Sequence, residues 1–96
     1  MKILHLTLKK KWFDMIASGE KKEEYRDGTT YWKKRLDGRD YDVVSCRNGY
    51  NKRAPKVVVE FFNCSVGFGK PKWGGDPNNF QYVIRLGEIL STENLD

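Results

Sequence analysis

Alternation of apolar and polar residues near the N-terminus predicts a strand. Residues 2–8 read KILHLTL, and Leu4, Leu6 and Leu8 recur at every second position. A period of two places alternate side chains on opposite faces of an extended chain. We therefore expect a strand over residues 2–8 whose leucine face is buried.

The next segment changes to the spacing of an amphipathic helix. Its apolar residues recur on one helical face: Trp12, Met15 and Ile16. Thr7 is the expected N-cap of a helix over about residues 9–18, and Gly19 the expected residue just beyond its C-terminal cap. We expect this apolar face to serve in the core and not in ligand contact.

A second short helix and a turn follow. The segment TTYWKKRLDG, residues 29–38, offers Thr29 or Thr30 as an N-cap and Gly38 as a stop signal. The dipeptide Asn48-Gly49 is typical of a hairpin turn.

Three further runs read as strands: residues 41–47, 56–66 and 80–90. The middle run, KVVVEFFNCSV, is apolar on both faces, which predicts a central strand covered on two sides. Glu60 within it then needs a partner, and a buried ion pair with Arg26 is favoured over a catalytic role. The stretch 67–79 is rich in glycine and proline and is expected to be a loop.

These elements add up to about five or six strands and two short helices. Strands joined by turns, with both helices early in the chain, favour a compact mixed sheet or small barrel over a doubly wound parallel sheet. We therefore predict the α+β class. Residues 1–90 would form a single domain, and residues 91–96 a polar, frayed C-terminal tail.

Length and composition agree with one small domain. The chain has 96 residues, of which 39% are hydrophobic and 14% aromatic, enough apolar mass for one core. No apolar run reaches the length of a membrane span and no signal peptide is evident, so a soluble, cytoplasmic protein without a membrane partner is expected. A monomer is expected in preference to an oligomer.

The cysteines and the single histidine argue against a metal site. Cys46, Cys64 and His5 are scattered and form no CxxC pair, whereas a structural zinc site needs four closely spaced ligands. We expect no metal and no cofactor, and we expect two buried free thiols in a reducing compartment.

Charge is distributed unevenly along the chain. The net charge is +5, and residues 1–56 carry 15 Lys and Arg against 8 Asp and Glu. A basic half favours phosphate-bearing partners, although many small soluble proteins are basic without such a role. Lys9, Lys10 and Lys11 at the first helical turn fit either a phosphate-facing patch or a solvated helix end.

The segment SGEKKEEYR, residues 18–26, has an order of charges that suits a turn followed by a strand. In a helix, Glu20 would face Glu24 and Lys22 would face Arg26, and both are repulsive pairs. In a strand, Lys22, Glu24 and Arg26 share one face, so the carboxylate lies between two cations. Lys21, in the turn, can reach back towards Glu24.

The same residues match the signature G-x-K-x-x-E-x-R at Gly19, Lys21, Glu24 and Arg26. In this signature, in the short helix before it and in the strand near the C-terminus, the chain resembles the ASCH (activating-signal-cointegrator homology) domains. The resemblance covers essentially the whole chain. It implies a small PUA-like β-barrel with helices over one opening, a cleft that bears the motif, and binding of RNA or of a nucleoside or nucleotide.

One branch of that family resembles small acetylcytidine amidohydrolases, which use a lysine, a threonine and a glutamate. Its lysine aligns on Lys21, whereas Glu24 stands where that branch has threonine. Its glutamate lies on a segment that corresponds to residues 67–79, where Asp76 is the single acid. The role of that threonine is therefore not carried over to Glu24. If the protein is an enzyme, Lys21 and Glu24 are the candidate catalytic residues.

The residue types of the motif suit ligand binding. Arg26 and Lys21 can hold a phosphate or a carbonyl edge as fork and point charge, and Glu24 can accept from an amino group of a base. Trp73, flanked by Lys70 and Lys72, can stack on a base or can plug a barrel end, and both alternatives stay open.

A second group of the same kind, Tyr50, Lys52 and Arg53, follows the Asn48-Gly49 turn. Three functions follow from the sequence. The leading hypothesis is an RNA- or nucleotide-binding module. The alternatives are a small hydrolase acting on a modified nucleoside or on RNA phosphodiesters, and a protein-interaction domain in which the motif is only a structural charge network.

Overall fold

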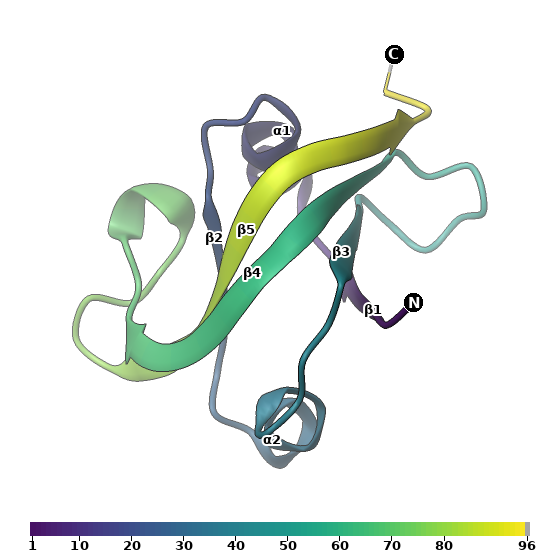
Figure 1. Ribbon diagram of the computed structural model, residues 1–96. Helices are drawn as coiled ribbons and strands as arrows, with labels where there is room; N and C mark the ends of the chain where they lie inside the picture. The colour runs from purple at the N-terminus through teal and green to yellow at the C-terminus, as the bar shows by residue number, and fades with distance from the viewer. Residues whose placement is uncertain (96) are drawn as a thin grey trace.

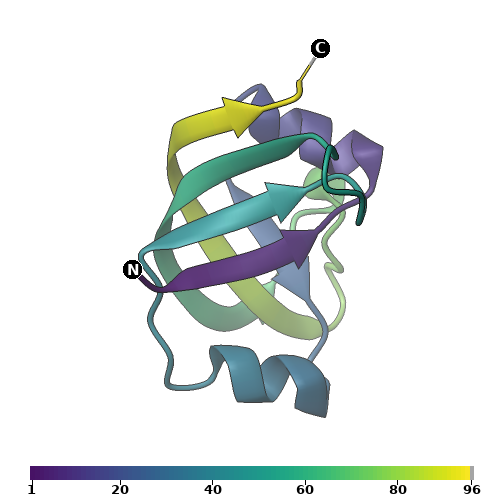
Figure 2. The same ribbon diagram turned by 90° about the vertical axis from the view of Figure 1, so that its right-hand side faces the viewer.

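The computed structural model describes residues 1–95 and shows a five-stranded sheet that curls into a half-barrel, with two helices at its ends (Figures 1 and 2). In chain order the elements are β1 Ile3–Thr7, α1 Lys10–Ala17, β2 Glu23–Arg26, α2 Thr30–Leu36, β3 Val43–Arg47, β4 Lys56–Phe68, the 3-10 turn η1 Pro71–Trp73, and β5 Phe80–Glu93. The α+β class predicted from the sequence is confirmed, with five strands and both helices in the first half of the chain.

The strands lie in the order β1-β3-β4-β5-β2. β1 pairs in parallel with β3, and the other three pairs are antiparallel. β1 and β2 are therefore the two edges of the curled sheet, and they are not joined in a ladder within the part of the chain that the structure describes. We call the gap between these two edge strands the seam.

Curvature comes from the long β4–β5 ribbon, which sweeps across the molecule in Figure 1. Its register shifts three times, at Val58/Val59, Val59/Phe61 and Phe61/Asn63. Each irregularity adds local twist and bends the strand. The ribbon can therefore carry β2 around towards β1 and leave the seam between them.

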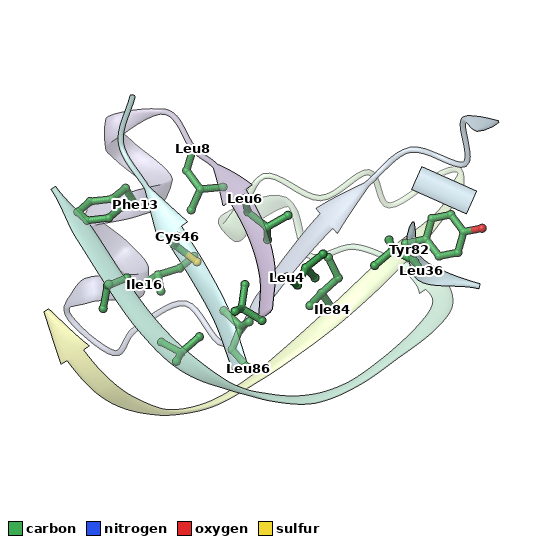
Figure 3. Close-up of a cluster of buried hydrophobic side chains, with 13 residues drawn as sticks. Leu4, Leu6, Leu8, Phe13, Ile16, Leu36, Cys46, Tyr82, Ile84 and Leu86 are labelled. Carbon is green, nitrogen blue, oxygen red and sulfur yellow. The ribbon is translucent and has the colours of Figure 1, made fainter. Parts of the chain in front are cut away.

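The core fills the concave side of the sheet (Figure 3). All three leucines of the N-terminal alternation, Leu4, Leu6 and Leu8, are buried in it, as the period of two predicts. Phe13 and Ile16 of α1 pack into the same cluster. Neither helix in residues 1–95 has the length and apolar character to cross a membrane.

The helix boundaries differ from expectation at one end. α1 is capped by Lys9, which makes no side-chain capping bond, so the prediction of Thr7 as N-cap is wrong. Thr7 is still within β1, because the leucine alternation keeps the chain extended to that point. Gly19 takes φ +86° just after the cap residue Ser18, as predicted, and Thr29 caps α2 by accepting from the Trp32 N–H.

The expectation of a two-sided cover for β4 is also wrong. Val57 and Val59 are buried, but Phe62 and Val66 are exposed, because the described elements leave this part of β4 uncovered, while the loop around Trp73 covers Val83 of β5. Glu60 is exposed there and accepts from the Glu88 N–H at 3.0 Å. The predicted ion pair between Glu60 and Arg26 is therefore absent from the described residues.

The β3–β4 loop and strand β5 are both longer than the sequence pattern suggests. The β3–β4 hairpin is closed by residues 48–55 and not by a two-residue turn at Asn48-Gly49. β5 continues to Glu93, three residues into the expected tail, because Val57 and Lys56 of β4 pair with Thr92 and Glu93. The loop predicted over residues 67–79 is confirmed between Gly69 and Asn79, apart from the short η1 turn.

Candidate functional site

A cleft of about 420 Å³ lies at the seam between β1 and β2. Its walls come from both edge strands, both helices and the β3–β4 loop. The side chains that line it are His5, Thr7, Leu8, Lys9, Trp12, Glu24, Arg26, Tyr31, Trp32 and Tyr50. Aromatic and cationic groups predominate in this set.

A chain of two ion pairs lies behind and along one wall of the cleft. Lys21 Nζ lies 2.7 Å from Glu24 Oε1, and Arg26 Nη1 lies 2.9 Å from Glu24 Oε2. One carboxylate thus joins two cations through its two separate oxygens. The prediction that Lys21 reaches back to Glu24 is confirmed. The prediction that Lys22 and Arg26 bracket Glu24 is wrong for Lys22, which is exposed and forms no ion pair among the described residues.

The arrangement of these residues follows from the local backbone. Gly19 adopts a left-handed conformation that ends α1 and returns the chain, which lets the Lys21 N–H donate to Met15 O at 2.9 Å. Glu24 and Arg26 then lie two residues apart on one face of β2. A helix stop followed at once by a strand is therefore what brings Lys21 and Arg26 to opposite sides of Glu24.

Lys21 is enclosed by protein and does not line the cleft. Only 2% of the residue is exposed, and its amine donates to Trp73 O as well as to Glu24. The same amine lies 5.1 Å from the Trp12 ring centroid and 5.2 Å from that of Tyr25. Lys21 therefore stabilises the wall from behind, and a ligand in the cleft meets Glu24 and Arg26 instead.

Arg26 is the cation that the fold presents to the cleft. Its Nη1 donates to Glu24 and to Tyr25 O, and its Nη2 donates to Thr7 O at 3.3 Å. The last of these bonds crosses the seam from β2 to β1. The Nε–H has no acceptor among residues 1–95, and the guanidinium lies 5.1 Å from the Trp32 ring centroid. A planar guanidinium held in this way has donors left for an anion.

Four aromatic side chains line the cleft together with Arg26. Trp32 and Tyr31 come from the start of α2, Trp12 from α1 and Tyr50 from the β3–β4 loop. The expectation that Trp12 serves only in the core is wrong: it is half-buried and lines the cleft, because Phe13 occupies the inward position of α1 instead. A hint of this was present in the sequence, since Lys11 and Trp12 adjoin at a helix start, where side chains are incompletely covered.

Trp73 lies away from the cleft. It is buried with Tyr25 and Val83 in a second small cluster, and its Nε1–H lacks a hydrogen-bond partner within the described part of the chain. Lys70 and Lys72 place their amines 4.6 Å and 4.8 Å from its ring centroid. Trp73 is therefore folded back against β2 and β5, and none of these three residues lines the cleft.

The 69–76 loop that carries Trp73 is tied to β2 by Tyr25. The Tyr25 hydroxyl donates to Glu23 Oε1 at 2.7 Å and accepts from the Lys70 N–H at 3.0 Å. Burial is the main reason that the pKa of Tyr25 lies above its ordinary value, and the neighbouring carboxylates raise this pKa further. This buried hydroxyl holds the 69–76 loop against β2, the strand that carries Glu24 and Arg26.

The second sequence-predicted group is divided by the structure. Tyr50 lines the cleft and is 90% exposed, whereas Lys52 and Arg53 lie further along the same loop and are not part of the lining. Seven residues that line the cleft were not among the predicted site residues: His5, Thr7, Leu8, Lys9, Trp12, Tyr31 and Trp32. Of these, only Lys9 belonged to a segment that the charge pattern singled out.

The thiols have no part in the cleft. Cys46 is buried in the core and Cys64 is half-buried, and both are free. Burial raises the pKa of Cys46 to about 12 and that of Cys64 to about 11, which keeps both protonated and unreactive at neutral pH. Within residues 1–95, no three His, Cys, Asp or Glu side chains are placed to hold a metal ion.

Comparison of the chain with protein-family models, with curated proteins and with solved structures finds no match. The chemistry of the cleft itself therefore carries the functional argument.

Proposed function

We propose that the protein is an RNA- or nucleotide-binding module of the PUA-like ASCH type and that its ligand occupies the seam cleft. The observation that carries this proposal is the position of Arg26, which lies beside the Trp32 ring in a cleft lined by three further aromatic side chains and retains unpaired donors. Cations that hold phosphate and aromatic rings that stack on bases are the two components of single-strand recognition.

Each part of a nucleotide has a matching group in the cleft. Arg26 and Lys9 supply charge for a phosphate, and Trp12, Trp32, Tyr31 and Tyr50 supply rings for a base. Both oxygens of Glu24 are already engaged by cations. Glu24 therefore orients Arg26 for binding, and other groups of the cleft wall recognise the base.

The contacts of Lys21 favour binding over hydrolysis. A nucleophilic or basic lysine has to present an unpaired amine to the substrate. The Lys21 amine is instead held by Glu24 and Trp73 O beneath the cleft wall. Asp76, the one acid of the 67–79 segment, is tied up by the Asn78 N–H and the Asn79 side chain.

The proposal is tested by ligand binding with a variant that leaves the fold intact. Tyr50 and Lys9 are both exposed, so we expect a Tyr50→Ala, Lys9→Gln double variant to fold as the wild type does. Thermal shift and calorimetry with nucleoside monophosphates and short RNAs should show binding to the wild type. Loss of one stacking ring and one phosphate contact should weaken binding by tenfold or more, since stacking contributes about 1–3 kcal/mol per base.

A matched control replaces an exposed aromatic and an exposed lysine outside the cleft. Phe62→Ala on the convex face and Lys2→Gln beside a separate hollow near α2 meet this need. We expect this control to bind as the wild type does. Equal affinity of both double variants, or no binding of any nucleotide or RNA to the wild type, would overturn the proposal. Chromatography of the bound ligand should recover it chemically unchanged.

A further inference from the structure

The aromatic side chains of the cleft belong to two separate rims. Tyr31 and Trp32 stand at the start of α2, whereas Trp12 and Tyr50 come from α1 and the β3–β4 loop. Figures 1 and 2 both place α1 and α2 at opposite ends of the sheet, with the strands between them. The cleft therefore has aromatic rings from both helices, and the Arg26 guanidinium lies beside the Trp32 ring at the α2 end while its Nη2 donates to Thr7 O, where β1 leads into α1.

A cation accompanies the ring at each rim. Lys11 Nζ lies 4.7 Å from the Trp12 ring centroid, and Arg35 Cζ lies 3.5 Å from that of Tyr31. Both of these basic residues are exposed and neither pairs with an acid among the described residues. Each rim thus has an exposed cation beside an aromatic ring, although neither cation lines the cleft itself.

The cleft offers aromatic rings at two rims. A mononucleotide has one base and one phosphate group, so it can stack at one rim and leaves the rings and the cation of the other rim unoccupied. Two adjacent bases joined by a phosphodiester offer a base to each rim and a phosphate to Arg26. In a duplex the bases stack on one another and are paired, so their faces are not available to protein rings.

We propose that the ligand of the seam cleft is a single-stranded polynucleotide, of which at least two consecutive nucleotides are held, one base at each rim and the linking phosphate at Arg26. This inference rests on the proposed function and specifies the class of its ligand. The backbone on either side of the two nucleotides passes the exposed Lys11 and Arg35. Single-strand sites of this kind track the backbone with cations and depend strongly on salt.

The test compares ligands that differ only in length and strandedness. Fluorescence anisotropy competition would use uridine monophosphate, the uridine dinucleotide, an oligouridylate of about eight nucleotides, which is within the usual range of single-strand site sizes, and an RNA hairpin with a fully paired stem closed by a minimal loop. We expect the dinucleotide to bind at least tenfold more tightly than the monophosphate, the oligouridylate more tightly still, and the hairpin more weakly than the oligouridylate.

Variants at the two rims test the geometry. Tyr31→Ala and Tyr50→Ala each remove one exposed ring. Both should weaken dinucleotide binding by about tenfold, whereas the monophosphate should respond to one of them alone. Arg35→Gln should lower the salt dependence of oligouridylate binding by about one phosphate equivalent, and Lys2→Gln, outside the cleft, should leave it unchanged.

The outcomes separate this inference from the proposed function. If the monophosphate binds as tightly as the dinucleotide and the oligouridylate, the two-rim inference is wrong while the nucleotide-binding function stands. Equal or tighter binding of the paired hairpin would also overturn the inference. If none of the four ligands binds, the inference and the proposed function fall together.

Discussion

Replacing Lys21 by methionine should destabilise the protein far more than replacing an exposed lysine of an ion pair. Lys21 and Glu24 are both buried, with side-chain exposures of 1% and 6%. Removing one member of a buried pair leaves the other charge without full compensation, at a cost of about 3–5 kcal/mol. Arg26 still lies 2.9 Å from Glu24, which places the expected loss near the lower end, at about 3 kcal/mol.

That loss is large for a chain of this length. A domain of this size has a total stability of about 5–15 kcal/mol. A loss of about 3 kcal/mol should lower Tm by roughly 12–24 °C in a small domain. Methionine is unbranched and only one heavy atom shorter than lysine, so the change chiefly removes the charge and its hydrogen bonds to Glu24 and Trp73 O.

The assay is equilibrium unfolding in urea at pH 7, followed by tryptophan fluorescence. The matched control is Lys10→Met, because Lys10 and Asp14 form an ion pair at 2.6 Å whose side chains are 78% and 53% exposed. An exposed pair is worth about 0.2–1 kcal/mol. The exposed Lys10–Asp14 pair should therefore contribute less to stability than the buried Lys21–Glu24 pair, although its contact is slightly shorter, because loss of a charge partner costs more free energy in a buried pair.

A second variant separates the charge from packing. Lys21→Met combined with Glu24→Leu removes both members of the buried pair, so we expect it to lose less stability than the sum of the two single changes. Equal and small effects of Lys21→Met and Lys10→Met, or strict additivity of the double variant, would refute the reasoning that Lys21 is held as a buried, paired charge.

Two further perturbations test other parts of the fold. The pKa of the Cys46 thiol is about 9 in the unfolded chain, and burial raises it to about 12 in the folded protein. The contribution of Cys46 to the free energy of unfolding should therefore be constant below pH 9. Between about pH 9 and 12 it should fall by up to about 1.4 kcal/mol per pH unit, because the unfolded thiol loses its proton first. The pKa of Tyr25 is also raised by burial and should add to the decline. Urea titrations across this range should show a shallower fall for Cys46→Ala, and parallel curves would contradict the assignment. Gly74→Ala should destabilise the protein more than Gly38→Ala. Both residues have positive φ, but a Cβ at Gly74 would lie 2.9 Å from the Trp12 ring, whereas a Cβ at Gly38 meets nothing within 4 Å. Equal losses of Tm would show that the Trp12 ring moves aside at no cost.

The exposed face of β4 shows where sequence patterns stop. KVVVEFFNCSV is apolar on both sides, and that composition is typical of a strand covered twice. Whether a second layer covers it depends on the rest of the chain, and both helices are placed at the ends of the half-barrel instead (Figure 2). Phe62 and Val66 therefore remain exposed although their residue types predict burial.

The sequence by itself determined the features that depend on neighbours along the chain. The leucine alternation, the stop at Gly19, the cap at Thr29 and the strand over Glu23–Arg26 arise from backbone preferences and periodicity within a few residues. The closeness of Lys21, Glu24 and Arg26 belongs to the same class, since a turn followed by a strand fixes their spacing.

Only the tertiary structure decided which side chains surround that motif. Trp73 and Trp12 are both tryptophans beside lysines, yet Trp73 is buried against Tyr25 and Val83 while Trp12 lines the cleft. Whether each tryptophan is buried depends on contacts between segments far apart in the sequence. The residues next to it in the chain do not determine which distant segment covers its side chain. The cleft itself exists because β4 and β5 bend the sheet until β1 and β2 face each other without pairing, and that closure is a property of the whole curled sheet.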